Sequence, residues 1–366
     1  MIESSPINTQ VIDSLIRKNI SFSIWRAPGG ETRFIIQEST EPDVLSDYNQ
    51  LDNAQGFVMA PFHPSHKHGI VVIKGKPSSL PCLNDVEKMN ESPSSDINES
   101  YIYNNVDEEF AAYESSFGKF MEKLDSGDIS KLVLSRRSVE AMRAATSAAS
   151  MFFKAEAAYP NSFVYLCNTP LTGTWLGCSP EILLSGGEKD GWRTVALAGT
   201  QPLNPDGSLP TSWDNKNREE QRVVEVYINN QLSSLGISSS MTNPTTVKAV
   251  SLAHLKTEFE FNLPDESSIG RLIANLHPTP AVCGYPKKES YEFILGNESY
   301  DREYYSGFMG YIDLAEHTDL YVNLRCAKIK KGEIILFAGG GLLKTSSLQN
   351  EWTETERKMS TIKSIS

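Results

Sequence analysis

The order of the predicted elements constrains this 366-residue chain more than any other feature of its sequence. Short segments rich in β-branched and aromatic residues follow one another directly, with turn residues between them, instead of alternating one by one with helices. Examples are the pair around Pro28-Gly29-Gly30 and the run at 163–167, 174–177, 182–185 and 194–198. Consecutive strands without regular helical crossovers predict an α+β fold with large, mainly antiparallel sheets.

Helices are expected where apolar residues recur at three- and four-residue steps. The strongest patterns lie at 110–124, 216–235 and 348–362, and weaker ones at 11–17, 141–158 and 265–276. Further strands are expected at 22–25, 33–36, 56–60, 69–74, 129–135, 304–313, 320–329 and 333–338. The segment 247–257 is expected to begin as a strand and to continue as a helix or loop.

A change in composition divides the chain. Between Pro77 and Ser100 there are six serines and three prolines, with almost no β-branched residues, so residues 76–100 are predicted to form a long surface loop. Residues 1–106 are therefore expected to be an N-terminal portion that adds strands to the main sheets. Residues 107–366 carry the motifs described below.

Charge and cysteine content exclude several classes of function. The net charge is −12, from 34 basic and 46 acidic residues, which argues against a nucleic-acid or anionic-membrane partner. A locally positive pocket can still bind an anion in such a protein. The five cysteines lie far apart without a C-x-x-C motif, which argues against a zinc site or a disulfide framework. Together with the lack of a secretory signal at Met1, they predict a cytoplasmic protein.

Lys131 is unusual because it lies within the apolar segment 129–135. By the two-residue period of a strand it shares a face with Ile129 and Val133. One reading is a lysine on an edge strand that extends to water. The other is a desolvated amine, whose pKa falls toward the range of a general base. The pattern alone leaves both readings open.

Glu181 directly precedes the apolar run 182–184. It is either the exposed start of a strand or a buried acid with a raised pKa that can donate a proton. Because carboxylates at strand ends are often structural, the pattern alone favours the first reading.

Carboxylates on two distant helices form a second candidate group. Glu220 projects on the apolar face of the helix predicted at 216–235, and Glu351, Glu354 and Lys358 form an i, i+3, i+7 row. The row is either a solvated one with an ordinary Glu354–Lys358 ion pair or part of a cation site. A few carboxylates with open coordination positions suit Mg²⁺.

Two further features suit an anion. Arg325 lies in the strand predicted at 320–329, where an arginine is either paired structurally or binds a carboxylate at two points. The turn predicted at Ala338-Gly339-Gly340-Gly341 allows backbone N–H groups to approach an anion.

Three histidines, His63, His66 and His68, form a cluster that could bind a metal. The prolines around them and the lack of an acidic or thiol partner favour a solvated loop instead.

The candidate residues belong to motifs that occur in one order along the chain. After the segment of Lys131 come Gly177-Cys178-Ser179-Pro180-Glu181, 196–200, 214–221, 254–257, 276–286, 305–310, 324–327, 338–341 and Glu351-Trp352-Thr353-Glu354. In this order, over about residues 107–366, the chain resembles the chorismate-utilising enzymes, the family of anthranilate synthase component I, aminodeoxychorismate synthase, salicylate synthase and isochorismate synthase. Each motif is weak alone, but the ordered set is specific. The resemblance implies α/β/β/α layers, with the sheets packed together and the helices outside.

Within this family the segment Leu276-His277-Pro278-Thr279-Pro280-Ala281 resembles that of the water-adding isochorismate synthases. Ammonia-using members have a different stretch there, which ends in Gly-Ala-Pro-Lys. The Leu-Leu-Glu-Ser motif associated with tryptophan feedback is also missing. The resemblance implies a Mg²⁺-dependent conversion of chorismate to isochorismate without a glutaminase subunit. The short N-terminal portion favours menaquinone over siderophore biosynthesis.

The resemblance also implies a role for each candidate residue. Lys131 would activate the water that attacks C2 of chorismate, and Glu181 would protonate the leaving C4 hydroxyl. Mg²⁺, held by Glu220 and Glu354 with Glu351 nearby, would bind the ring carboxylate. The other substrate contacts are assigned to Arg325, Gly199, Thr200, His254, Tyr305, Gly339, Gly340, Gly341 and Lys358.

Two departures and two alternatives accompany this hypothesis. Relatives commonly have Glu-His where this chain has Glu220-Gln221, so support of the cation is expected to differ, and the portion before Asp107 matches poorly. The chain could instead be a related enzyme, such as salicylate or anthranilate synthase. It could also be a binding protein that keeps the fold, although the retention of Lys131 and Glu181 argues against that.

Overall fold

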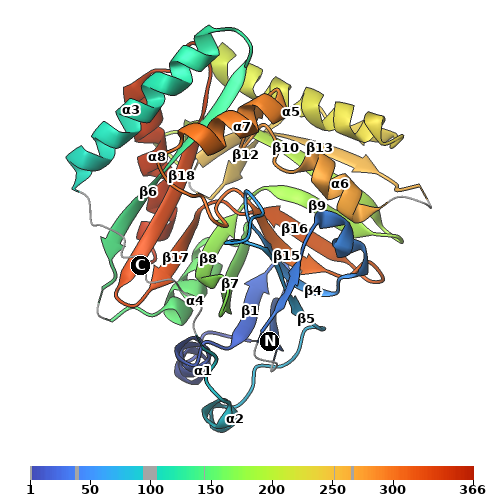
Figure 1. Cartoon of the computed structure of the whole chain (residues 1–366), viewed down its shortest axis with the longest axis vertical. Helices are drawn as coiled ribbons and strands as arrows, with labels where there is room; N and C mark the ends of the chain where they lie inside the picture. The colour runs from blue at the N-terminus through green and yellow to red at the C-terminus, as the bar shows by residue number, and fades with distance from the viewer. Residues whose placement is uncertain (1, 38–40, 94–104, 144, 251, 265–267) are drawn as a thin grey trace.

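Two large sheets dominate the computed structural model, which describes residues 2–37, 41–93, 105–143, 145–250, 252–264 and 268–366 (Figure 1). Within these ranges the paired strands of both sheets run antiparallel. The α+β class with large antiparallel sheets, predicted from the order of the elements, is confirmed.

The first sheet has eight strands, in the order β14-β6-β18-β17-β8-β7-β1-β2. Their bounds are β1 (Ser21–Arg26), β2 (Thr32–Gln37), β6 (Lys131–Ala141), β7 (Phe163–Thr169), β8 (Gly173–Ser179), β14 (Gly284–Tyr285), β17 (Cys326–Lys330) and β18 (Glu333–Leu342).

The second sheet has ten strands, in the order β11-β13-β10-β9-β16-β15-β4-β5-β3, with β12 paired to β13. Their bounds are β3 (Asp43–Leu45), β4 (Gly56–Ala60), β5 (Ile70–Lys74), β9 (Ile182–Gly187), β10 (Gly191–Pro202), β11 (Ser239–Met241), β12 (Thr245–Ala249), β13 (Leu252–Phe261), β15 (Phe308–Ile312) and β16 (Thr318–Val322).

Helices cover the outer faces of the sheets. Their bounds are α1 (Pro6–Arg17), α2 (Leu83–Lys88), α3 (Val106–Asp125), α4 (Ala148–Ala158), α5 (Asn215–Ser234), α6 (Ile269–Leu276), α7 (Lys287–Asn297) and α8 (Leu348–Lys363), with a 3-10 helix η1 (Tyr48–Asn53). Helices α1 and α4 pack on the first sheet, and α5 and α6 on the second. A third apolar core lies between the sheets, which gives the α/β/β/α layering.

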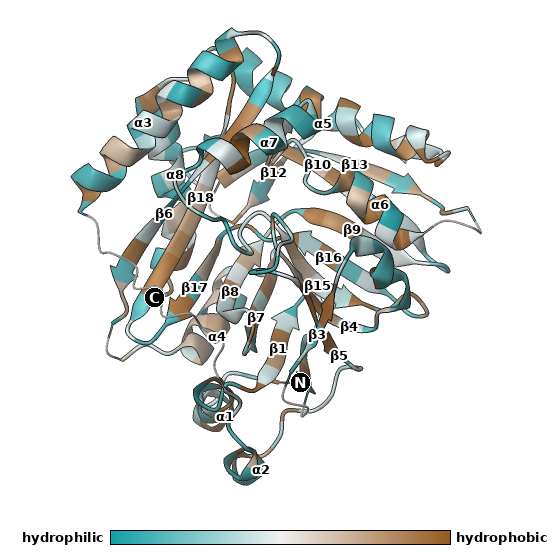
Figure 2. Ribbon diagram, in the orientation of Figure 1, coloured by the Kyte–Doolittle hydropathy of each residue, from teal (hydrophilic) through white to brown (hydrophobic). Residues whose placement is uncertain are grey.

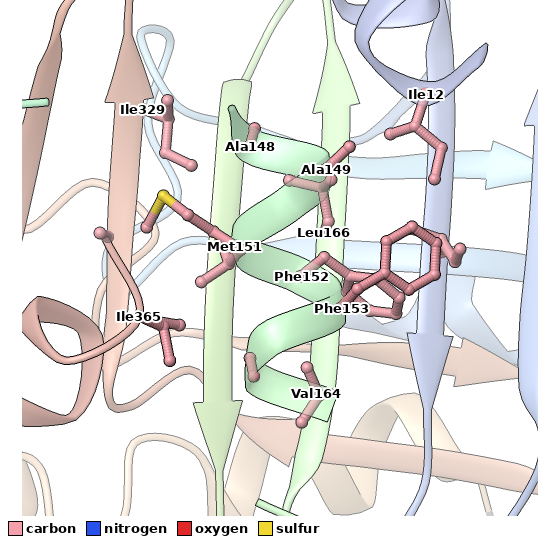
Figure 3. Close-up of a cluster of buried hydrophobic side chains, with 14 of the residues drawn as sticks. Ile12, Ala148, Ala149, Met151, Phe152, Phe153, Val164, Leu166, Ile329 and Ile365 are labelled. Atoms are coloured by element: carbon pink, nitrogen blue, oxygen red, sulfur yellow. The ribbon is translucent and has the colours of Figure 1, made fainter. Parts of the chain in front are cut away.

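Strand β1 shows how the sequence produces these layers, because successive side chains of a strand point to opposite faces. Phe22 and Ile24 join the outer core beneath α1 and α4, where Phe152 also packs (Figure 3). Trp25 faces the other way, and its ring centroid lies 5.1 Å from that of Phe57 on the second sheet. Helices α3 and α5 show hydrophilic and hydrophobic residues in alternation (Figure 2), as expected for helices with one buried face.

The strongly periodic helices are all confirmed: α3, α5 and α8 lie where the patterns placed them. Helix α3 ends at Asp125, and Gly127 follows with a φ of 89°, a conformation that favours glycine. None of the helices in the described ranges has both the length and the apolar character needed to cross a bilayer.

The single strand predicted at 320–329 is wrong. Strand β16 belongs to the second sheet and β17 to the first, and residues 323–325 form the crossing between them. Arg325 has a φ of 48°, in the left-handed region that interrupts a strand. The apolar pattern hid the crossing because the strands on both sides of it are largely buried.

The turn predicted at 338–341 is also wrong. These residues lie within β18 and pair with β6 in a continuous register, with Gly341 opposite Val133. Glycine usually weakens a strand, so three in succession suggested a turn. In this strand the glycines create space, as described below.

Smaller differences concern element boundaries. Strand β6 extends to Ala141, so the helix predicted at 141–158 begins only at Ala148, and the segment 247–257 belongs to the hairpin of β12 and β13. Helix α7 was not predicted because only Ser290 and Ile294 are buried along it. The loop predicted at 76–100 contains α2, and its residues 94–100 lie outside the described residues.

Strands from the first 75 residues lie in both sheets: β1 and β2 in the first, and β3, β4 and β5 in the second. The division that we propose between residues 1–106 and 107–366 therefore passes through both sheets.

A buried ion pair fixes the segment that leads into β15. Arg302 makes two hydrogen bonds of 2.6 Å to Glu298, and it also donates to the carbonyl oxygens of Val282 and Val133. The side chains of Arg302 and Glu298 are only 2% and 3% exposed. Arg302 thereby connects α7, β6 and the segment before β15.

We expect Arg302→Met to lower the free energy of unfolding by about 3–5 kcal/mol, because it leaves the Glu298 carboxylate buried without its partner. The measurement is denaturant unfolding followed by circular dichroism. The matched control is Arg222→Met, which removes an exposed ion pair with Glu219 and should cost no more than about 1 kcal/mol. Equal losses in the two variants would contradict this assignment.

Candidate active site

Lys131 begins β6, and its side chain is 0% exposed. The reading in which it extends to water from a strand edge is therefore wrong. Its Nζ atom lies 3.1 Å from Oε1 of Glu220 on α5 and has no hydrogen-bond partner within the described residues. A buried amine with one ion-pair partner and no hydrogen bond is unusual and marks this position for chemistry.

The glycines of β18 provide the space for this ion pair. A Cβ atom on Gly341 would overlap Oε1 of Glu220 and would lie 2.9 Å from Cε of Lys131. A Cβ atom on Gly340 would lie 2.8 Å from Oε2 of Glu351. The absence of side chains on β18 therefore allows carboxylates from α5 and α8 to approach the strand.

A lysine accompanies each of the three carboxylates. Besides the Lys131–Glu220 pair, Lys216 lies 2.6 Å from Glu351, and Lys358 lies 2.6 Å from Glu354. Lys358 also donates to the carbonyl oxygen of Gly339 at 2.8 Å. Sequence reasoning missed Lys216, which shares the segment 214–221 with Glu220 and could have been found there.

The charge of Lys216 acts on the whole group. Burial alone would lower its pKa, but Glu351, Glu220 and Glu354 together raise it. Burial and the neighbouring Glu354 raise the pKa of Glu351, whereas Lys358 lowers that of Glu354 against the effect of burial. Lys216 thus interacts electrostatically with all three carboxylates, although among the described residues it forms an ion pair only with Glu351.

The chemistry of this group fits Mg²⁺. Carboxylate oxygens are the ligands that the ion prefers, and Oε2 of Glu351 is buried without a hydrogen-bond partner. No group of three or more His, Cys, Asp or Glu side chains in the described ranges is already arranged to hold a metal. Each of the three carboxylates forms an ion pair with a lysine.

Glu181 lies between β8 and β9 and is 2% exposed, so the reading as an exposed strand start is wrong. Its carbonyl oxygen accepts a hydrogen bond from Val322 N, which fixes the backbone. Burial raises the pKa of Glu181 to about 8, although the nearby charge of Lys131 opposes the rise. The carboxyl group therefore holds its proton at neutral pH.

Arg325 lies at the crossing between the sheets and is 6% exposed. Its Nη2 atom lies 3.1 Å from Nε2 of His254, while Nη1 has no hydrogen-bond partner within the described residues. Nδ1 of His254 lies 2.8 Å from the Gly199 carbonyl oxygen, so we assign the imidazole proton to Nδ1. Burial and Arg325 lower the pKa of His254, which keeps it neutral, and the buried Nη1 is available to an anion.

One cavity collects most of the predicted residues. Its lining includes Glu181, Gly199, Thr200, Glu220, His254, Tyr305, Arg325, Gly339, Gly341 and Lys358. The remaining predicted residues, Lys131, Gly340, Glu351 and Glu354, are not part of this lining. The cavity measures only about 60 Å³, so a larger molecule requires side chains to move aside. Apolar wall residues that the sequence did not identify include Val133, Leu197 and Phe337.

Gln221, the neighbour of Glu220 on α5, contacts the second sheet. It accepts a hydrogen bond from Ala198 N at 2.9 Å and donates to the Ala196 carbonyl oxygen and to Thr257. Gln221 therefore holds α5 against β10 and sets the position from which Glu220 reaches β18.

Comparisons with known proteins show the family to which this chain belongs. The family model described as "Chorismate binding enzyme" matches residues 79–365. Isochorismate synthase EntC of Escherichia coli (strain K12) is 33% identical over 251 residues, which cover 65% of this chain and 62% of EntC. The match thus spans less than two thirds of that relative. The vibriobactin-specific isochorismate synthase of Vibrio cholerae is 26% identical over 339 residues, covering 86% of this chain and 80% of the relative.

The solved structure of MenF, the menaquinone-specific isochorismate synthase from Escherichia coli, has the same fold. Its TM-score is 0.77 at 19% sequence identity, with 99% of this chain and 92% of MenF covered. Both the layered fold and the family model thus extend over most of the chain, and the chain belongs to the family of chorismate-binding enzymes.

Proposed function

We propose that this protein is an isochorismate synthase, which converts chorismate to isochorismate and uses Mg²⁺. The observation that carries the proposal is the combination of a fully buried amine, Lys131, with a nearby buried carboxyl group, Glu181, whose pKa is raised to about 8. Moving a hydroxyl group between ring carbons requires one group that accepts a proton and one that donates a proton. The names of EntC and of the Vibrio cholerae relative support the same reaction.

The proposed reaction requires Lys131 to release its own proton first, after which its amine takes a proton from a water molecule as the water oxygen bonds to C2 of the chorismate ring. The ring double bond shifts, and the bond between C4 and its hydroxyl oxygen breaks. Glu181 donates its proton to that hydroxyl group, which leaves as water. One water is added and one is lost, so substrate and product are isomers, and exchange with solvent restores both protonation states.

The two carboxylates of chorismate need positively charged partners. The unpaired Nη1 of Arg325 is suited to bind one of them, and His254 holds the guanidinium in place. Mg²⁺ would supply positive charge to the other when Glu220, Glu351 and Glu354 hold it. Lys358, fixed on the Gly339 carbonyl oxygen, adds a further positive charge at the wall of the cavity.

We propose menaquinone biosynthesis as the pathway and the cytoplasm as the location, with no glutaminase subunit. All five cysteines are free thiols, which supports a reducing compartment. Supply of isochorismate to a siderophore is the second candidate, and the long match to the vibriobactin-specific relative favours it.

Product analysis tests the function directly. We expect the protein to form isochorismate from chorismate and Mg²⁺, without pyruvate release and without any need for an amine, and to lose this activity with excess chelator. Chromatography with mass detection identifies the product. Salicylate with pyruvate, or anthranilate in the presence of ammonia, would contradict the proposal.

Removal of either proton-transfer group should strongly reduce turnover. We expect Lys131→Ala and Glu181→Gln each to lower kcat by about 10²–10⁴-fold, the usual contribution of a positioned acid or base. The measurement is initial rate at saturating chorismate and Mg²⁺, with circular dichroism to verify folding. A near-normal rate in either folded variant rules out its assigned role.

The pH dependence follows from the raised pKa of Glu181. The acid must be protonated, and its protonated fraction falls as pH rises through about 8. We therefore expect kcat to fall about tenfold per pH unit above that value, because only the protonated form donates. Initial rates between pH 6 and pH 10 test this in a buffer series of constant ionic strength. A rate that stays constant to the alkaline end would show that Glu181 is not the acid.

A further inference from the structure

One wall of the candidate active-site cavity comes from the segment 277–286, which connects α6 to α7. Ala281 and Val282 of this segment line the cavity together with Glu181. Apart from the two residues of β14, the segment is irregular backbone. Such backbone needs partners for its polar groups from other segments, so the position of this wall depends on how its two ends are held.

The second half of the segment is held on β6, the strand that carries Lys131. Strand β14 pairs with β6 so that Tyr285 lies opposite Lys131. Close to this pair, Val133 N donates to the Cys283 carbonyl oxygen at 2.7 Å. This half of the wall is therefore fixed beside the residue proposed as the base.

The first half of the segment follows the C-terminal end of α6, where a helix leaves carbonyl groups without partners of its own. Lys287, the first residue of α7, binds these groups. Its Nζ atom donates to the carbonyl oxygens of Ala274, Asn275 and His277 at 3.0, 3.1 and 2.6 Å. A positive charge is favourable at this point because the C-terminal end of a helix carries a partial negative charge.

The charge of Lys287 has no carboxylate partner among the described residues, and burial lowers its pKa to about 8. An ammonium group withdrawn from water is costly unless its N–H groups are bonded. The three carbonyl oxygens therefore account for the presence of a lysine at this position. The next residue, Lys288, is exposed to solvent, so two adjacent lysines differ in their surroundings.

Helix α5 contacts the same point. The hydroxyl group of Tyr227 donates to the carbonyl oxygens of Asn275 and Leu276. Tyr227 lies seven residues after Glu220, and residues at this spacing project from one face of a helix. The start of the wall segment is therefore also joined to the helix that carries Glu220.

Thr279 connects the wall segment to the residue proposed as the acid. Its Oγ1 atom and Oε1 of Glu181 are both buried without a hydrogen-bond partner within the described residues. The Thr279 hydroxyl is nevertheless close enough to lower the pKa of Glu181 against the effect of burial. A small shift of the segment therefore decides whether this hydroxyl can donate to the carboxyl group.

We infer that Lys287 is a positioning residue of the candidate active site, which by holding the C-terminal end of α6 places Val282 in the cavity wall and Thr279 beside Glu181. Lys287 is not part of the cavity lining, so it acts through the segment 277–286. The inference rests on the proposed function, because this segment adjoins the proposed acid. A misplacement of about 1 Å far from the reacting atoms can cost up to about 10²-fold in rate.

Hydrogen–deuterium exchange measured by mass spectrometry tests the position of the segment independently of turnover. In Lys287→Met we expect the amides of residues 277–286 to exchange about tenfold faster, because hydrogen bonds to the helix end are lost. The amides of Val282 and Cys283, which both donate to the Thr279 carbonyl oxygen, report on it directly. Lys288→Met is the matched control and should exchange as the unmodified protein does. Equal exchange in the two variants would overturn the inference.

Steady-state kinetics tests the consequence for the reaction. We expect Lys287→Met to lower kcat about tenfold or more and to change the KM for chorismate less than about threefold, because Arg325 and α8 lie outside the segment. Lys288→Met should keep the unmodified values. Lys287→Arg retains the charge and several N–H donors, so it should recover most of kcat. Faster exchange with unchanged kcat in Lys287→Met, or no recovery in a folded Lys287→Arg, would contradict the assigned role.

A milder variant keeps the inference testable if Lys287→Met does not fold. Lys287→Gln retains N–H donors without the charge, so we expect the same changes in exchange and kcat, in the same direction but smaller. Unmodified behaviour of Lys287→Gln in both measurements would overturn the inference. If the unmodified protein does not convert chorismate, the proposed function fails, whereas the exchange measurement still decides whether Lys287 holds the segment.

Discussion

The charge of Lys131 has to be balanced inside the protein, and the arrangement of the site follows from that requirement. An ammonium group removed from water is costly unless a carboxylate approaches it closely. Strand β6 has no carboxylate near Lys131, because its first acidic residue is Glu140 at the far end of the strand. Glu220 comes instead from α5, a helix that packs on the other sheet, and it lies 3.1 Å from the amine. Gly341 permits this approach, since a Cβ atom there would occupy the position of the carboxylate oxygen.

At this site the first sheet contributes the amine of Lys131, and helix α5 on the second sheet contributes the carboxylate that pairs with it. Helix α5 is held on β10 by Gln221, and α8 follows β18 directly in the chain, so both helices have fixed positions before any carboxylate interaction is considered. Packing and backbone hydrogen bonds set the positions of the helices. The ion pairs therefore form between helices and strands whose positions the apolar cores fix. This rigid support holds several charged side chains close together.

The sequence predicted the candidate site residues better than it predicted the strand and turn boundaries around them. Lys131, Glu181 and Glu220 were identified because they lie within or beside apolar patterns, whereas Glu351 and Glu354 were identified from their spacing on one predicted helix. The structure pairs Lys131 with Glu220 and places Glu181 and Glu220 in the lining of one cavity. Arg325 was placed in a strand because burial on both sides of the crossing conceals which sheet each half joins. The β18 glycines resembled a turn because local propensity carries no information about a carboxylate from another helix. Lys216 could have been found in the segment that it shares with Glu220, but its pairing with Glu351 depends on a contact between distant helices that sequence periodicity does not show.

Exclusion of water sets the protonation states across the candidate active site. Burial raises the pKa of Glu181 and lowers those of His254 and Arg325, the last to about 10, so it favours a neutral acid and a neutral imidazole beside a guanidinium that stays charged at neutral pH. The neutral His254 can then accept a hydrogen bond from Arg325 instead of repelling it. The same burial would be lost at each group if the cavity opened fully to water. Acid strength and anion binding therefore depend on one property, the closure of the space between the sheets, and a segment that alters this closure affects both together.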